Sequence, residues 1–120
     1  MNITIKATNI VLTTTIEEYV RKYFGTLEKF VKGESNDLVC AIEIGKTTHH
    51  HKHGDIFRAE ANLYVKPKSI YASSEKEDLY SAIDDVRKEI ERGLVSVKKK
   101  IIKTSRKVGA EIKKSIKNIE

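Results

Sequence analysis

The sequence of 120 residues contains one cysteine, one proline and no tryptophan, and it has no long apolar run. A single thiol cannot form an internal disulfide, so Cys40 fits a reducing compartment, and its place in an alternating pattern predicts a small buried side chain. No segment is long and apolar enough to span a bilayer. The N-terminus, MNITIKATNIVL, lacks the basic region and apolar block of an export signal, so we expect a cytoplasmic protein.

Positive charge is unevenly distributed along the chain, although the formal net charge is +6. Residues 1–97 contain 14 Lys and Arg against 15 Asp and Glu, whereas residues 98–120 contain nine against two. We therefore predict one nearly neutral domain over residues 1–97 and a basic C-terminal extension or tail over residues 98–120. A basic segment of this kind favours a polyanionic partner, either nucleic acid or an anionic membrane surface.

The first third of the chain changes from a strand pattern to a helical one. Residues 2–8 alternate, with Ile3, Ile5 and Ala7 on one face, which predicts a half-buried strand. Residues 12–33 then follow the helical period, and Thr13 to Thr15 offer an N-cap. The apolar side of this predicted helix consists of Ile16, Val20, Tyr23, Phe24, Leu27, Phe30 and Val31.

Three further strands and a second helix follow. The strands are predicted at residues 36–45, 56–66 and 69–73, and the turn at Pro67 suits an antiparallel hairpin. The apolar side of the second helix consists of Leu79, Ile83, Val86, Ile90, Leu94, Val97 and Ile101. The order β-α-β-β-β-α predicts an α+β fold, in which two helices pack on one face of a four-stranded sheet.

Cations recur on the outward sides of both predicted helices. At 100° per residue they lie away from the apolar positions, at Lys22 and Lys29 in the first helix and at Lys88, Arg92, Lys99, Lys103 and Arg106 in the second. If the helices lie side by side, these residues form one cationic surface, which is the electrostatic footprint of nucleic-acid binding. The alternative is that they are ordinary solvated side chains, diluted by Glu18, Glu28 and Glu91.

All four histidines lie in the segment KTTHHHKHGD, residues 46–55, between two predicted strands. A zinc site needs three or four converging ligands held by neighbouring groups, and this segment lacks the usual Cys or spaced-His pattern, so we predict no metal and no cofactor. A solvated polar loop is the favoured interpretation. The alternative is contact with RNA through Lys46, His49, His50, His51, Lys52 and His53.

Two other classes of function stay open at this point. One is a metal-dependent RNA-processing enzyme that uses the histidine segment with Asp55, although no paired carboxylates or metal motif accompany it. The other is a membrane-surface protein that docks through the basic tail. Against membrane docking, tryptophan is absent and neither Phe nor Leu occurs after Leu94.

The segment at residues 71–94, YASSEKEDLYSAIDDVRKEIERGL, resembles the signature of the ribosome hibernation-promoting factors, the family that includes ribosome-associated inhibitor A. TIEEYVRKYFGTLEKF, at residues 15–30, is similar to the first helix of that family, and GDIFRAEANLYV, at residues 54–65, resembles its third strand. The resemblance extends from about residue 2 to residue 98.

This resemblance implies a protein that binds the small ribosomal subunit and its rRNA, in the channel for messenger RNA and the anticodon ends of transfer RNA. Translation would stop by steric occlusion, so no catalytic residues, small-molecule substrate or membrane partner are expected. By position, Lys29 and Arg92 match family basic residues that face ribosomal RNA. Nothing after Lys98 has a strand pattern, so the chain resembles a short form with no apparent dimerisation domain.

Overall fold

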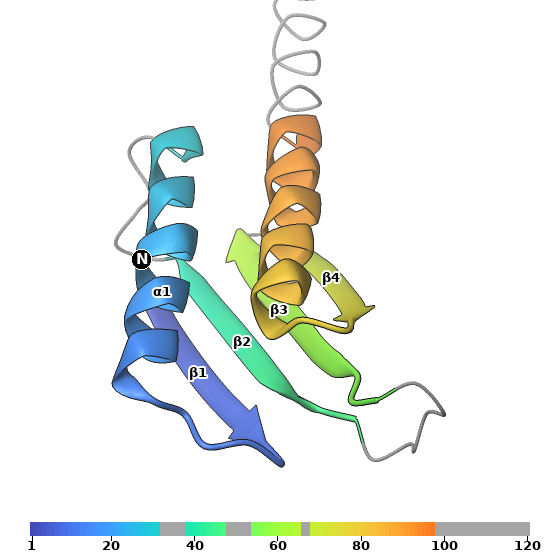
Figure 1. Ribbon diagram of the computed structural model, residues 1–120. Coiled ribbons are helices and arrows are strands. Elements are labelled where there is room, and N and C mark those ends of the chain that lie inside the picture. The colour runs from blue at the N-terminus through green and yellow to red at the C-terminus, as the bar shows by residue number, and fades with distance from the viewer. Residues whose placement is uncertain (32–37, 48–53, 66–67, 98–120) are drawn as a thin grey trace, which may run out of the picture.

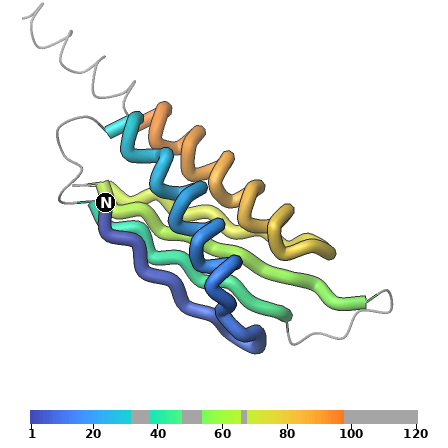
Figure 2. The backbone as a smooth tube through the Cα atoms, turned by 60° about the vertical axis from the view of Figure 1, so that its left-hand side comes forward, coloured from blue at the N-terminus to red at the C-terminus, as the bar shows by residue number. Residues whose placement is uncertain are grey.

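The computed structural model of the chain describes residues 1–31, 38–47, 54–65 and 68–97 (Figure 1). Its elements follow in the order β1 (Asn2–Thr8), α1 (Thr14–Gly25), the 3₁₀ helix η1 (Thr26–Phe30), β2 (Val39–Lys46), β3 (Phe57–Val65), β4 (Lys68–Lys76) and a second helix over residues 79–97. The strands form one sheet in the order β1-β2-β3-β4, and both helices lie on the same face of it (Figures 1 and 2). The predicted α+β fold is confirmed.

The directions of the strands fix the directions of the helices. β1 and β2 are parallel, because α1 intervenes and returns the chain to the starting end of the sheet. β2 with β3 and β3 with β4 are antiparallel, so β4 runs in the same direction as β1 and β2. Each helix packs back along the strand that precedes it. The second helix and α1 therefore lie side by side and point the same way (Figures 1 and 2).

The hydrophobic core lies between the sheet and the helices. The predicted inward residues of β2 and β3 are buried, apart from Phe57, which packs against the margin of the core. Both helices direct the predicted apolar side toward the core. Ile16, Phe30 and Val97 are partly covered, and Ile101 lies outside the described residues. Tyr23 differs from the prediction, since 38% of its surface is exposed. It lies at the edge of the apolar side of α1, where its ring contacts Tyr19.

The first helix begins at the predicted position, but its α-helical part ends before the predicted C-terminus. The Thr13 hydroxyl accepts a hydrogen bond from the Ile16 amide at 3.2 Å, which caps the N-terminus of α1. The α-helix ends at Gly25, and residues Thr26–Phe30 continue as η1. At this junction the Thr26 hydroxyl donates to the Tyr23 carbonyl at 2.7 Å, so a side chain uses a carbonyl of the last α-helical turn. η1 still directs Leu27 into the core.

Gly93 marks the closest approach of the second helix to the sheet. A Cβ atom at this position would lie 2.6 Å from Ile70 Cγ2 on β4, whereas a Cβ at Gly25 would have no heavy atom within 4 Å. We expect Gly93→Ala to lower the free energy of unfolding by about 1–3 kcal/mol, because the added methyl overpacks the core. Gly25→Ala should raise it by up to about 1 kcal/mol through helix propensity.

Urea denaturation of the two variants measures this difference. Equal unfolding midpoints for Gly93→Ala and Gly25→Ala would show that the contact between Gly93 and Ile70 does not limit the packing of the helix.

Candidate nucleic-acid interface

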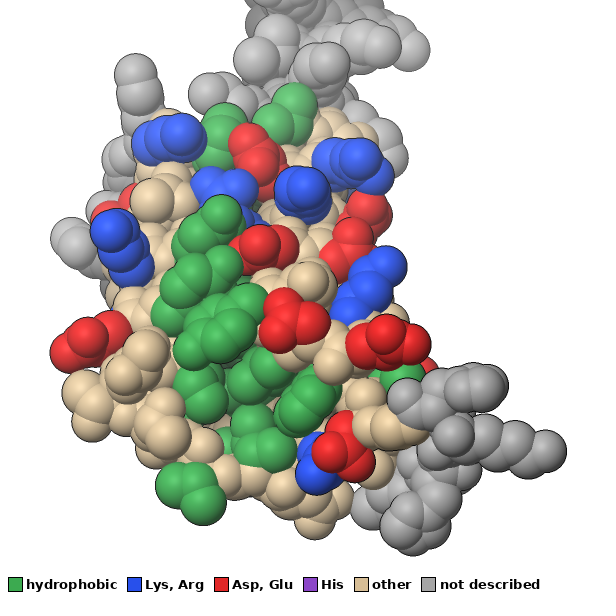
Figure 3. Space-filling view, in the orientation of Figure 1, with side chains coloured by type: hydrophobic (Ala, Val, Ile, Leu, Met, Phe, Trp, Pro, Cys, Tyr) green, Lys and Arg blue, Asp and Glu red, His purple; other side chains and the backbone are tan. Residues whose placement is uncertain are grey.

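The predicted cations that the structure describes lie in the C-terminal halves of the two parallel helices. Lys22 is in the last turn of α1, and Lys29 is in the last turn of η1. Lys88 and Arg92 are one turn apart on the second helix, and all four side chains are exposed. Figure 3 shows Lys and Arg side chains gathered over this part of the helical face. We call these four residues the basic end.

Acidic side chains are concentrated at the other end of the same helices. Glu17 and Glu18 lie in the first turns of α1, while Asp78, Asp84 and Asp85 lie at the start of the second helix. Asp78 caps that helix by accepting from the Ser81 amide at 2.9 Å. Carboxylates at helix N-termini and cations near C-termini both interact favourably with the helix macrodipole. Glu28, Glu89 and Glu91 lie among the cations of the basic end, so the helical face as a whole is not a continuous cationic surface.

The cations of the basic end are available to an external anion. Lys22, Lys29 and Lys88 form no ion pair with any residue in the described part of the chain. Arg92 pairs with Glu89 at 2.6 Å, but its side chain is 75% exposed. An exposed pair of this kind stabilises by only about 0–1 kcal/mol, so Arg92 can exchange Glu89 for a phosphate at little cost.

Arg87, which the sequence did not single out, fixes the position of the basic end. Its Nε donates to the Tyr23 carbonyl at 2.9 Å, and its Nη2 donates to the Thr26 hydroxyl at 2.7 Å. Its Nη1 pairs with Glu91 at 2.8 Å, and its side chain is only 14% exposed. These bonds join the second helix to the junction between α1 and η1. The ion pair of Arg87 with Glu91 could have been predicted from their i,i+4 spacing in the sequence. The bonds from Arg87 to α1 could not, because they join residues far apart in the sequence.

Three tyrosines pack in the seam between the helices. The Tyr19 ring lies 4.9 Å from the Tyr23 ring and 4.8 Å from the Tyr80 ring, the latter edge to face. The Tyr19 hydroxyl donates to Asp84 Oδ1 at 2.5 Å. Burial, reinforced by Asp84, raises the pKa of Tyr19, so its hydroxyl stays protonated and keeps this bond. Together with Arg87, the tyrosines hold the helices in a fixed relative position.

Cys40 lies in the core, as predicted for a small buried side chain. Burial raises the pKa of its thiol to about 12. Because the thiolate is the nucleophilic form, a thiol with this pKa is almost unreactive at neutral pH.

The histidine segment begins and ends next to paired strands. Lys46 pairs with Asp55 at 2.9 Å, and the Thr47 amide donates to the Ile56 carbonyl at 2.9 Å. The proposed loop contacts His49, His50, His51, Lys52 and His53 lie outside the described residues, as do Lys99, Lys103 and Arg106. Among the residues that the structure describes, no three or more His, Cys, Asp or Glu side chains are grouped to hold a metal ion. Neither helix, over its described length, combines the length and apolarity needed to cross a membrane.

Comparison with known proteins identifies related sequences over most of the chain. Residues 3–102 match the family described as sigma 54 modulation protein / S30EA ribosomal protein. The ribosome hibernation promoting factor of Escherichia coli K12 is 29% identical over 101 residues, which are 84% of this chain and 97% of that protein. The factor of the same name from Klebsiella oxytoca is 30% identical over 101 residues, again 84% and 97% of the two chains.

Two solved structures have a similar fold. The N-terminal domain of Thermus thermophilus Protein Y aligns with a TM-score of 0.66 and 25% identity, over 78% of this chain and 96% of that one. A ribosomal subunit interface protein from Coxiella burnetii aligns with a TM-score of 0.64 and 17% identity, over 82% and 98% of the two chains. The second likeness concerns the fold alone.

Arg87 and Lys88 are adjacent cations with different roles, which a pair of substitutions separates. Arg87→Gln should lower the free energy of unfolding by about 1–3 kcal/mol, because it removes the charged hydrogen bonds to the Tyr23 carbonyl and the Thr26 hydroxyl that join the two helices, together with the ion pair to Glu91. Lys88→Gln, at an exposed position, should change it by less than about 0.5 kcal/mol. Guanidinium chloride titrations followed by circular dichroism measure both, and equal stability of the two variants would contradict the role given to Arg87.

Proposed function

The chain belongs to the sigma 54 modulation protein / S30EA ribosomal protein family, which includes ribosome hibernation promoting factors, and on that premise we propose that it binds the small ribosomal subunit and blocks translation. In this proposal the basic end contacts ribosomal RNA in the channel for messenger RNA and the anticodon ends of transfer RNA. The observation that carries it is the location of four exposed cations, Lys22, Lys29, Lys88 and Arg92, at one end of two parallel helices.

The distribution of charge supports contact through the basic end. Ribosomal RNA presents a dense array of phosphates, and cations that neutralise them release condensed counterions, which supplies most of the sequence-independent affinity. The acidic starts of both helices would be repelled by the same phosphates. Lys99, Lys103 and Arg106 of the C-terminal extension add further cations to the proposed contact.

The proposed mechanism is occlusion, in which the protein inhibits by occupying space. Such a mechanism requires a body that keeps its shape against the competing RNA. Arg87 and the tyrosines of the seam meet this requirement, because they join the two helices over the sheet. No covalent step is needed, so we propose a cytoplasmic, non-enzymatic protein without a cofactor.

Charge reversal tests the proposed RNA contact. Lys29→Glu combined with Arg92→Glu should weaken binding to purified small subunits by at least about tenfold and lower the slope of log affinity against log salt by about 2. The parent protein should lose about 10³–10⁵ in affinity between 50 and 200 mM salt if it neutralises about 6–10 phosphates.

The matched control is Lys6→Glu combined with Lys76→Glu, which makes the same change of charge at exposed positions on the sheet. Sedimentation of each variant with small subunits through sucrose, at several salt concentrations, gives the affinities. If the two double variants lose affinity equally, only overall charge matters and the basic end is not the contact surface.

Competition tests the proposed place of binding. Small subunits that already hold messenger RNA and transfer RNA should retain much less of the protein than empty subunits, because both would occupy the same channel. Sedimentation at constant low salt compares the two. Equal retention by filled and empty subunits would exclude the decoding channel as the binding site. Binding would then have to occur elsewhere on the subunit.

A further inference from the structure

One face of the sheet has no helix over it (Figure 2), and on this face residues of all four strands line a groove. Its centre is the small side chain of Ala41, which stands opposite Asn62 in the β2–β3 register. One side of the groove is aromatic, because Tyr64 and Tyr71 are 45% and 57% exposed there. The groove therefore combines the small Ala41 and the polar Asn62 with exposed ring surfaces, on the face of the sheet opposite the helices.

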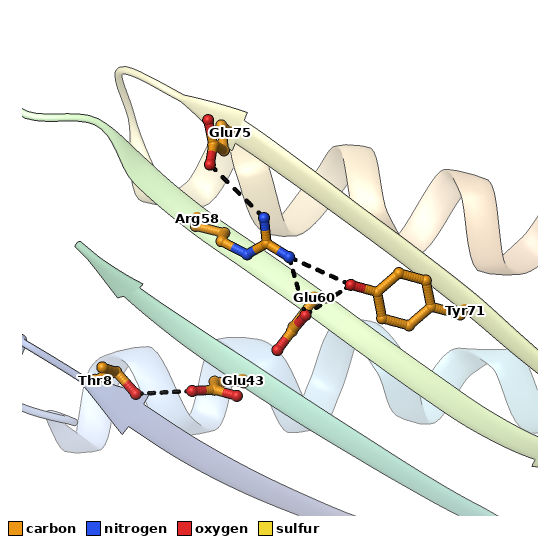
Figure 4. A network of polar contacts seen from close by, with 6 residues as sticks. All are labelled: Thr8, Glu43, Arg58, Glu60, Tyr71 and Glu75. Carbon is orange, nitrogen blue, oxygen red and sulfur yellow. Dashed lines mark hydrogen bonds and ion pairs between the residues drawn. The ribbon is translucent and has the colours of Figure 1, made fainter. Parts of the chain in front are cut away.

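Two carboxylates face each other at one end of this groove. Glu43 on β2 and Glu60 on β3 are register partners, so both side chains project from the same face of the sheet (Figure 4). Like charges directly opposite one another on neighbouring strands are destabilising. A sheet that keeps such a pair requires positive charge nearby.

Glu60 has that compensation within the chain. It accepts from the Tyr71 hydroxyl at 2.7 Å and pairs with Arg58 Nη2 at 3.1 Å (Figure 4). The hydrogen bond from Tyr71, and then that from Arg58, hold the pKa of Glu60 below its ordinary value, although burial opposes them. Arg58 is engaged further by Glu75, 3.7 Å away.

Glu43 has no such compensation among the described residues. Its one hydrogen bond there is from the Thr8 hydroxyl, at 2.8 Å (Figure 4). It forms no ion pair in the described part of the chain, even though Lys6 is its register partner on β1. The groove thus presents Glu43, in contact with Glu60 and without a paired cation in the described part of the chain, near the exposed ring of Tyr71.

We propose that this groove binds an arginine side chain from a basic segment of another protein. The guanidinium would contact Glu43 and Glu60, where its planar donors match carboxylate oxygens, and the neighbouring ring of Tyr71 would add cation–π attraction. A nucleic acid fits less well, because Glu43, Glu60 and Glu75 outnumber Lys6 and Arg58 on this face and repel phosphate. This interaction lies beyond the proposed RNA contact and does not depend on it.

A blocked peptide with two arginines, acetyl-Gly-Arg-Gly-Arg-Gly-amide, provides the test. Titrated at low salt into the full ¹⁵N-labelled chain, it should produce saturable amide shifts around residues 41–43, 60–64 and 71. Glu43→Gln should weaken this binding by about three- to fivefold, the range expected for one partly exposed ion pair. The same peptide with lysine in place of arginine should bind less tightly, because lysine lacks the planar donors that match two carboxylates.

Glu18→Gln is the matched control, since it removes the same charge from an exposed site on α1. The proposal is overturned if Glu18→Gln and Glu43→Gln weaken binding equally, or if the shifts lie at the acidic starts of the helices. It is also overturned if a single-stranded oligouridylate, and not the peptide, shifts the groove residues. Because these measurements use no ribosomes, their failure leaves the proposed binding to the small subunit untouched.

Discussion

Two helices that point the same way bury one face of the sheet. The distribution of charge and the two exposed surfaces of the domain depend on this arrangement. β1, β2 and β4 share one direction, so the helices that follow β1 and β4 must return in parallel. Their free amide groups then lie at the same end of the domain, where carboxylates such as Glu17 and Asp78 are stabilised. The acidic starts of the helices follow from this topology, and the exposed cations lie farther along the same helical face.

The two sides of the domain differ in the charge that they expose. Alternation along each strand sends Cys40, Ile42 and Leu63 into the core and exposes their neighbours on the open face. The open face contains tyrosines and an excess of carboxylates, while the basic end contains cations with few partners in the described part of the chain. In the two proposals, the polyanion lies against the helical side and the basic protein against the open face, so the sheet separates the two contacts and they need not compete.

Much of the fold could be predicted from the sequence, because it depends on local periodicity. The order of strands and helices, the Thr13 cap and the buried Cys40 are confirmed, although β4 extends to Lys76, beyond its predicted end at residue 73. The early end of α1 could not be predicted, since it involves a hydroxyl-to-carbonyl bond at Thr26 that competes with helix continuation. Outward placement of Lys22, Lys29, Lys88 and Arg92 was visible in the helical period. The bonds of Arg87 to α1 and the opposition of Glu43 and Glu60 were not, because each depends on contacts between segments far apart in sequence.

Separation of carboxylates and cations along two aligned helices also gives the domain a permanent electric dipole moment. In the field of a large polyanion, such a body experiences a torque as well as an attraction. Rotational diffusion is then biased before any atoms touch, so a greater fraction of encounters begins in the productive orientation. Removing acidic residues from the far end would therefore weaken this orientation, so that encounters with a polyanion would begin over a wider range of angles.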